Sequence, residues 1–174
     1  RPPDVATRET LFPPTIGLTL DRQSELRYGE NSHQQAAVYK LVGTTGVSLV
    51  SAKQLNGKEL SYNNLLDLDS AFAIVRAFEQ PTASVIKHNN PCGAAVGADL
   101  AEAARKALDG DPLSAFGGVL AFNRVVDAAT AEADEHEMLR GAGTGGTGVA
   151  ELGIGTNEKA ILTGNLIEDE KILG

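Results

Sequence analysis

The sequence predicts a layered α/β fold, in which helices pack on a sheet. Short apolar runs that are typical of buried strands alternate with helical patterns, and the connections between them are short. The chain has 174 residues, 42% of them hydrophobic, which is enough to build a core. Functional groups of such domains gather on loops beside strand ends, so we expect the motifs described below on loops.

The N-terminal part is predicted to begin with an irregular lead-in over residues 1–26. Four prolines disfavour a helix there, and only residues 16–20 resemble a strand. Residues 36–41 and 47–50 are strand candidates on either side of the turn 43–46. The simplest interpretation is a β-hairpin.

The strongest helical pattern covers residues 63–80, where apolar side chains recur at three- and four-residue steps. Ser61 or Asn63 can cap this helix, and Pro81 prevents its continuation. The later predicted elements are a buried strand over 83–86, a helix from Asp99 to Leu108, a strand over 119–122 and a helix that begins near Asp127.

A glycine-rich tract over residues 141–148 breaks this alternation. It has almost no side-chain area to bury, which is typical of a linker. The predicted organisation is therefore a lead-in over 1–26, a domain over 27–140, the linker, and a separate, unrelated tail over 149–174.

The formal charge of −8, from 15 basic and 23 acidic residues, argues against a basic face for nucleic acid or an anionic membrane. The single cysteine, Cys92, excludes an internal disulfide and suits a reducing compartment. Residues 1–4 show no apolar signal region, and no run approaches the ~18 apolar residues of a membrane span. We expect a cytoplasmic protein without nucleic-acid or membrane partners.

The densest group of reactive side chains directly follows the predicted strand 83–86. Lys87 supplies a fixed cation, and His88 can exchange a proton near neutral pH. The pair suits acyl-type transfer, with His88 as proton acceptor and Lys87 stabilising an oxyanion. Asn-Pro and Gly93 predict a sharp turn here. The alternative is a plain surface turn with two solvated side chains, and Cys92 is assigned no catalytic role.

A second group lies over residues 27–34. Arg27 can bind a phosphate in bidentate fashion, and Tyr28 can stack on a heterocycle, so a nucleotide monophosphate is a suitable ligand. The alternative is an Arg-Tyr pair that packs at a domain edge. His33 is interpreted as a loop residue that forms hydrogen bonds.

Two further candidates lie at a helix start and a glycine pair. Asn63 and Asn64 bring amide groups to a positive helix end, although simple capping explains them equally well. In the segment 111–118, Gly117 and Gly118 let the backbone approach a ligand, unless the segment is an ordinary tight connection. No two histidines stand at i, i+4, so no metal is expected.

Four motifs occur in an order that resembles a known family. They are Leu26–Gln34, Gly57–Asn64, Ile86–Gly93 and Asp111–Gly118. On these motifs, residues 1 to about 135 resemble the start of the transformylase region of the bifunctional purine biosynthesis family, AICAR transformylase/IMP cyclohydrolase. Ser32 stands where the family usually has proline.

The resemblance implies formyl transfer from 10-formyltetrahydrofolate to the 5-amino group of AICAR, which gives FAICAR. It also implies a cytidine-deaminase-like fold without catalytic zinc, and a homodimer. Lys87 and His88 match the catalytic pair. Arg27, Tyr28, Asn64, His88 and Gly117 match residues that bind AICAR. The family's transformylase region continues for about twice this length.

Residues 150–174 instead resemble a stretch of the thermophilic metallo-aminopeptidase family, in which a glutamate near this motif serves the metal centre. Glu151 is its counterpart, but the partner ligands are absent, so no peptidase activity is expected. The main alternative to a formyltransferase is a truncated or chimeric nucleotide-binding module without turnover.

Overall fold

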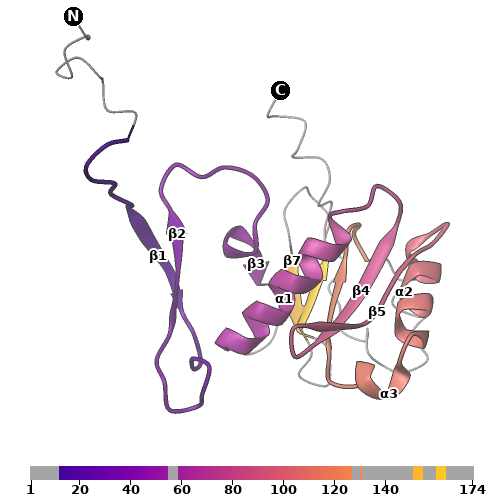
Figure 1. Ribbon diagram of the computed structural model, residues 1–174. Coiled ribbons are helices and arrows are strands. Elements are labelled where there is room, and N and C mark those ends of the chain that lie inside the picture. The colour runs from indigo at the N-terminus through magenta and orange to yellow at the C-terminus, as the bar shows by residue number, and fades with distance from the viewer. Residues whose placement is uncertain (1–11, 55–58, 127–129, 131–150, 155–159, 164–174) are drawn as a thin grey trace, which may run out of the picture.

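The computed structural model describes residues 12–54, 59–126, 130, 151–154 and 160–163 (Figure 1). A mixed sheet has the order β3-β7-β8-β6-β4-β5, and β1 and β2 form a second sheet. The strands are β1 Leu20–Glu25, β2 Ala37–Leu41, β3 Lys53–Gln54, β4 Thr82–Lys87, β5 Asn90–Val96, β6 Val119–Phe122, β7 Glu151–Ile154 and β8 Ala160–Thr163. The helices are the 3-10 turn η2 Leu49–Ser51, and α1 Tyr62–Val75, α2 Leu100–Asp109 and α3 Pro112–Ala115.

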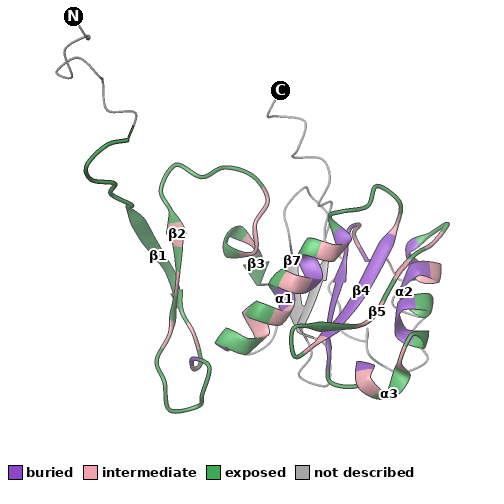
Figure 2. Ribbon diagram, viewed as in Figure 1, coloured by how far each residue is buried: buried purple, intermediate pink, exposed green. Residues whose placement is uncertain are grey.

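The two faces of the large sheet carry separate apolar cores. Ala83 and Val85 of β4 belong to the core under α2, whereas Ile86 belongs to the core under α1. The same alternation divides β6, because neighbouring side chains of a strand point to opposite faces. Figure 2 shows both strands buried between the helices. The predicted layered α/β class is confirmed, and the likeness to cytidine deaminases stays a prediction.

Helix α1 begins where the sequence predicts and ends five residues early. Ser61 caps it: the Asn64 backbone N–H donates to Ser61 Oγ at 3.3 Å, and the Ser61 N–H donates to Asn64 Oδ1 at 3.1 Å. This reciprocal pair is a capping box. The apolar pattern continues to Phe78, but that side chain is 44% exposed and lies outside the helix.

The segment between α1 and β4 has a tertiary partner. Asn123, which is fully buried, donates from Nδ2 to the carbonyls of Phe78 at 2.9 Å and Gln80 at 2.7 Å. Its Oδ1 accepts from the Thr82 N–H at 2.8 Å. One side chain after β6 therefore satisfies three backbone groups of the α1–β4 connection, which apolar periodicity does not reveal.

Replacing Asn123 by alanine is expected to lower the free energy of unfolding by about 2–4 kcal/mol, because it leaves buried backbone groups without partners. Urea unfolding followed by circular dichroism measures the loss. The exposed Asn31 provides the control, since its replacement by alanine should change stability by less than about 0.5 kcal/mol. Equal effects of the two variants would contradict this account.

The predicted N-terminal hairpin is wrong. Residues 36–41 contain a strand, but its antiparallel partner is β1, and residues 47–50 form no strand. Instead, Ser51 donates its N–H to Ser48 Oγ at 3.3 Å and closes η2. All six residues of β1 are exposed, so pairing with β2 and not burial forms a strand inside the predicted lead-in.

The later predicted elements that the structure describes agree with the sequence, and the structure adds β5, α3, β7 and β8. β4, α2 with its Asp99 cap, and β6 lie where they are predicted. The start of the helix predicted at Asp127 and the linker 141–148 lie outside the described residues. Within the predicted tail, β8 pairs parallel with β6, and β7 joins β8 to β3. These strands extend the sheet, whereas the sequence predicts that residues 149–174 form a separate tail. The predicted domain boundaries stay a prediction.

Candidate functional site

The loop that carries Arg27 and Tyr28 is fixed to the N-terminal end of α1. The Arg27 N–H donates to the Leu60 carbonyl at 2.9 Å, and the Tyr62 N–H donates to the Tyr28 carbonyl at 3.1 Å. The Arg27 guanidinium lies 4.9 Å from the centre of the Tyr28 ring, and its Nη2 donates to the Tyr28 hydroxyl at 3.2 Å. A cation and an aromatic ring are thus presented together beside a helix end.

Asn64 shares this helix end. Its Oδ1 accepts from both the N–H and the hydroxyl of Ser61, so the capping interpretation accounts for the oxygen. Its Nδ2 donates to no residue in the described part of the chain. The amide donor therefore stays available to a ligand next to the Arg27 loop.

The Lys87 motif differs from the loop that the sequence predicts. Only His88 and Asn89 form the turn, with φ of 53° and 62°, and Asn90 already begins β5. Pro91 fits the strand because β5 is an edge strand with a register shift opposite Ile86. His88 is exposed at the tip of the β4–β5 hairpin.

Gly93 also has a role other than the sharp turn predicted for it. It lies within β5, where a Cβ would stand 1.9 Å from the Ala107 carbonyl oxygen. Helix α2 therefore packs so closely on β5 that only glycine fits. Gly93 therefore allows α2 to pack on β5 and does not form the turn.

Lys87 and Gly117 lie together. Lys87 Nζ donates to the Phe116 carbonyl at 3.0 Å, and Gly117 follows with φ of 78°, a conformation that favours glycine. Hydrogen bonds from Ser114 hold the pKa of Asp111 below its usual value, and the Lys87 ammonium adds to this. The segment after α2 thus supplies the carbonyl that accepts from the Lys87 ammonium.

The Cys92 thiol is not activated. Its partial burial raises the pKa of the thiol, and the negative charges of Asp111 and Asp67 raise it further against the opposing effect of Lys87. A raised pKa keeps the sulfur protonated at neutral pH, and the thiolate is the reactive form. That Cys92 has no catalytic role stays a prediction.

The six candidate residues thus fall into two groups. Arg27, Tyr28 and Asn64 meet at the start of α1. Lys87 and Gly117 meet at the end of β4, with His88 next to them in the turn. Sequence reasoning missed Asp67 and Ser70, which join α1 to this turn: the Asn89 N–H donates to Asp67 Oδ1 at 2.7 Å, and Ser70 Oγ donates to Asn89 Oδ1. The sequence shows that both residues share one face of a helix, but it does not show that this face contacts Asn89.

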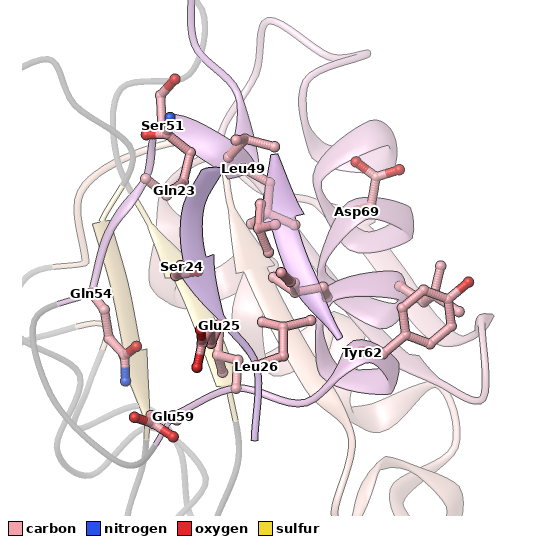
Figure 3. Close-up of a pocket in the computed structure, with 17 residues that line it drawn as sticks. Gln23, Ser24, Glu25, Leu26, Leu49, Ser51, Gln54, Glu59, Tyr62 and Asp69 are labelled. Atoms are coloured by element: carbon pink, nitrogen blue, oxygen red, sulfur yellow. The ribbon is translucent and has the colours of Figure 1, made fainter. Parts of the chain in front are cut away.

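A pocket of ≈ 770 Å³ has none of the six candidate residues in its lining, although Leu60 and Tyr62, which bond to the Arg27 loop, line it (Figure 3). The β1–β2 ribbon, η2 and one face of α1 line it, and its walls include the carboxylates of Glu25, Glu59 and Asp69. An anionic nucleotide would be repelled by these charges. We therefore do not assign the nucleotide to this pocket.

The described residues hold neither a metal-binding cluster nor a helix that could span a membrane. Among those residues, no three His, Cys, Asp or Glu side chains gather in a way that could hold a metal ion. None of the described helices has the length and apolar character that crossing a bilayer requires. That no metal takes part stays a prediction.

The fold and these two groups define the class of the chain: an α/β domain whose polar loops and hairpin turn carry cations, amides and an imidazole. The model of the AICARFT/IMPCHase bienzyme family matches residues 4–140, and the chain belongs to this family. The resemblance seen in the sequence is confirmed. The origin of the tail is not addressed by this match.

A relative supports the same assignment. The chain is 60% identical over 121 residues to the bifunctional purine biosynthesis protein PurH of Rhodopirellula baltica (strain DSM 10527 / NCIMB 13988 / SH1). The match covers 70% of this chain and 23% of the relative. The chain therefore spans less than a quarter of the protein that it matches.

Proposed function

We propose that this chain carries the first part of an AICAR transformylase and acts in purine biosynthesis. The proposed reaction is formyl transfer from 10-formyltetrahydrofolate to the 5-amino group of AICAR. The observation that carries the proposal is the family match over residues 4–140, which includes both groups of candidate residues. In the complete family this activity accompanies IMP cyclohydrolase.

The proposed chemistry assigns one role to each member of the Lys87–His88 pair. The AICAR amine attacks the formyl carbon, a new C–N bond forms, and the bond from that carbon to N10 of the folate breaks. His88 accepts the proton that the amine loses, and Lys87 stabilises the oxyanion on the attacked carbon. His88 returns that proton to N10 as it leaves, so the products are FAICAR and tetrahydrofolate. The exposure of His88 and the fixed ammonium of Lys87 support these roles.

The proposed AICAR contacts come from both groups. Arg27 binds the phosphate, Tyr28 stacks on the heterocycle, and Asn64 donates from its available amide. The Gly117 backbone lies beside Lys87, where it can approach the same ligand. The stacking of Arg27 on Tyr28 supports a joint role, because it holds both side chains in one orientation.

The partial match to the relative carries a second candidate function. The match covers 23% of the relative, so groups that complete the folate site would lie outside the matched stretch. The chain would then be a nucleotide-binding module without turnover. We further propose that a complete member of the family acts as a homodimer in the cytoplasm, without nucleic-acid or membrane partners.

Calorimetric titration of the chain with AICAR tests the proposal, followed by an assay of tetrahydrofolate release with 10-formyltetrahydrofolate. Saturable binding with turnover supports the formyltransferase. Binding without turnover supports the nucleotide-binding module. A folded chain that binds no AICAR would refute both, and the family would then describe ancestry alone.

Replacing Arg27 by alanine is expected to weaken AICAR binding by about tenfold to a hundredfold, since charge-assisted hydrogen bonds to the phosphate are lost. The same titration measures the change. Arg105, an exposed arginine on α2, is the matched control, and its replacement by alanine should leave the affinity unchanged. Unchanged affinity of a folded Arg27→Ala variant would remove the phosphate-binding role.

A further inference from the structure

One face of α1 carries three polar side chains that all bond outside the helix. Asn63, Asp67 and Ser70 stand at i, i+4 and i+7, and we call them the polar row. Asn63 Nδ2 donates to the Glu30 carbonyl at 3.1 Å, while Asp67 and Ser70 hold Asn89. At 1.5 Å rise per residue the row spans about 10 Å, so it joins the Arg27 loop to the His88 turn across a short distance.

The other faces of α1 serve different purposes. Its buried residues face the core, and another set lines the pocket of Figure 3. The buried set is Leu68, Ala71, Phe72 and Val75, and the pocket set is Tyr62, Leu65, Leu66 and Asp69. The polar row therefore forms a third face that contacts both candidate motifs.

The His88–Asn89 turn, which the polar row holds, has an unfavourable backbone conformation. His88 and Asn89 are consecutive non-glycine residues with φ of 53° and 62°, a conformation that persists only where its surroundings enforce it. Asp67 accepts from the Asn89 N–H and Ser70 donates to the Asn89 side chain. Asn90 Nδ2 adds a bond of 2.8 Å to the His88 carbonyl.

We propose that Asp67 and Ser70 are positioning residues that hold His88, through Asn89, at a fixed place relative to the Arg27 loop. This rests on the proposed function of His88 as proton acceptor. Neither residue needs to touch the substrate, because the effect passes through the turn. A displacement of about 1 Å at a reacting group can lower a rate by about a hundredfold, so the two hydrogen bonds at Asn89 matter for chemistry as well as folding.

Three variants separate the hydrogen bond from the charge. Asp67→Ala removes both, whereas Asp67→Asn keeps an acceptor oxygen for the Asn89 N–H and removes only the charge. Asp69→Ala is the matched control, because Asp69 is exposed on the same helix and lies on the pocket face. Circular dichroism and thermal unfolding establish that each variant folds.

Hydrogen exchange of the Asn89 amide, followed by NMR, gives the first readout. We expect exchange at least about tenfold faster in Asp67→Ala and within about threefold of wild type in Asp67→Asn and Asp69→Ala. AICAR titration gives the second. Binding should weaken about tenfold in Asp67→Ala and recover to within about threefold in Asp67→Asn.

The outcomes separate this inference from the proposed function. An unchanged Asn89 exchange rate in Asp67→Ala overturns the inference, and so does an equal loss of AICAR binding in Asp67→Ala and Asp67→Asn. If the wild type binds no AICAR, the proposed function fails, and the Asn89 exchange rates alone decide whether Asp67 holds the turn. If Asp67→Ala does not fold, Ser70→Ala replaces it. Faster exchange of the Asn89 amide in Ser70→Ala would then support the inference, and an unchanged exchange rate would overturn it.

Discussion

Replacing His88 by alanine is expected to lower the rate of formyl transfer by about 10²–10⁴-fold, the usual contribution of a positioned general base. His88 is exposed at the tip of the β4–β5 hairpin, and within the described residues its ring makes no hydrogen bond. The substitution therefore removes the imidazole with little effect on folding. The rate of tetrahydrofolate release with saturating AICAR and 10-formyltetrahydrofolate measures the loss.

His33 supplies the control for this experiment. It is a second exposed histidine, on the loop after Tyr28, and no catalytic role is proposed for it. His33→Ala should keep the wild-type rate. A His88→Ala variant that is folded, binds AICAR and retains more than half of the wild-type rate would show that His88 is not the proton acceptor.

Replacing Gly93 by alanine is expected to lower the free energy of unfolding by about 3 kcal/mol or more, which is at the upper end for overpacking. A Cβ at residue 93 would meet the carbonyl oxygen of Ala107 at 1.9 Å and its carbon at 2.9 Å. These are backbone atoms of α2, so the helix as a whole must move away from β5. Urea unfolding and the circular dichroism spectrum measure the loss.

Gly17 is a suitable comparison for Gly93. Nothing lies within 4 Å of a Cβ built there, so Gly17→Ala should change the free energy of unfolding by less than about 0.5 kcal/mol. If Gly93→Ala is as stable as Gly17→Ala, then α2 does not pack on β5 as closely as described.

These two predictions concern one short motif with two functions. Its first residues, Lys87 and His88, present reactive groups, while Gly93 admits the helix that supports the strand behind them. The turn and the packing are linked because β5 begins directly after Asn89. The motif is therefore a structural unit as well as a chemical one.

The chemical character of the candidate residues could be predicted from the sequence, but their surroundings could not. The cation at Lys87 and the glycine pair after residue 116 were identified as separate motifs, and the structure joins them through the Phe116 carbonyl. Asp67 and Ser70 were missed because their role depends on Asn89, about twenty residues away. Spacing along a helix indicates which side chains share a face, but it does not indicate what that face contacts.

The sequence by itself determined the layered α/β class, the starts of α1 and α2, and the buried strands β4 and β6. These features follow from local signals: apolar periodicity, caps at Ser61 and Asp99, and short buried runs. It also determined the family, because four ordered motifs are specific when taken together.

Only the tertiary structure decided which strands pair, what the segment after α1 bonds to, and why Gly93 is glycine. β2 pairs with an entirely exposed strand that has no apolar residue after Leu20, and the buried Asn123 side chain satisfies the backbone after α1 from over forty residues away. Strand pairing and the satisfaction of buried polar groups join distant parts of the chain. Their partners become defined only when the chain is folded, which is the physical reason that local patterns do not reveal them.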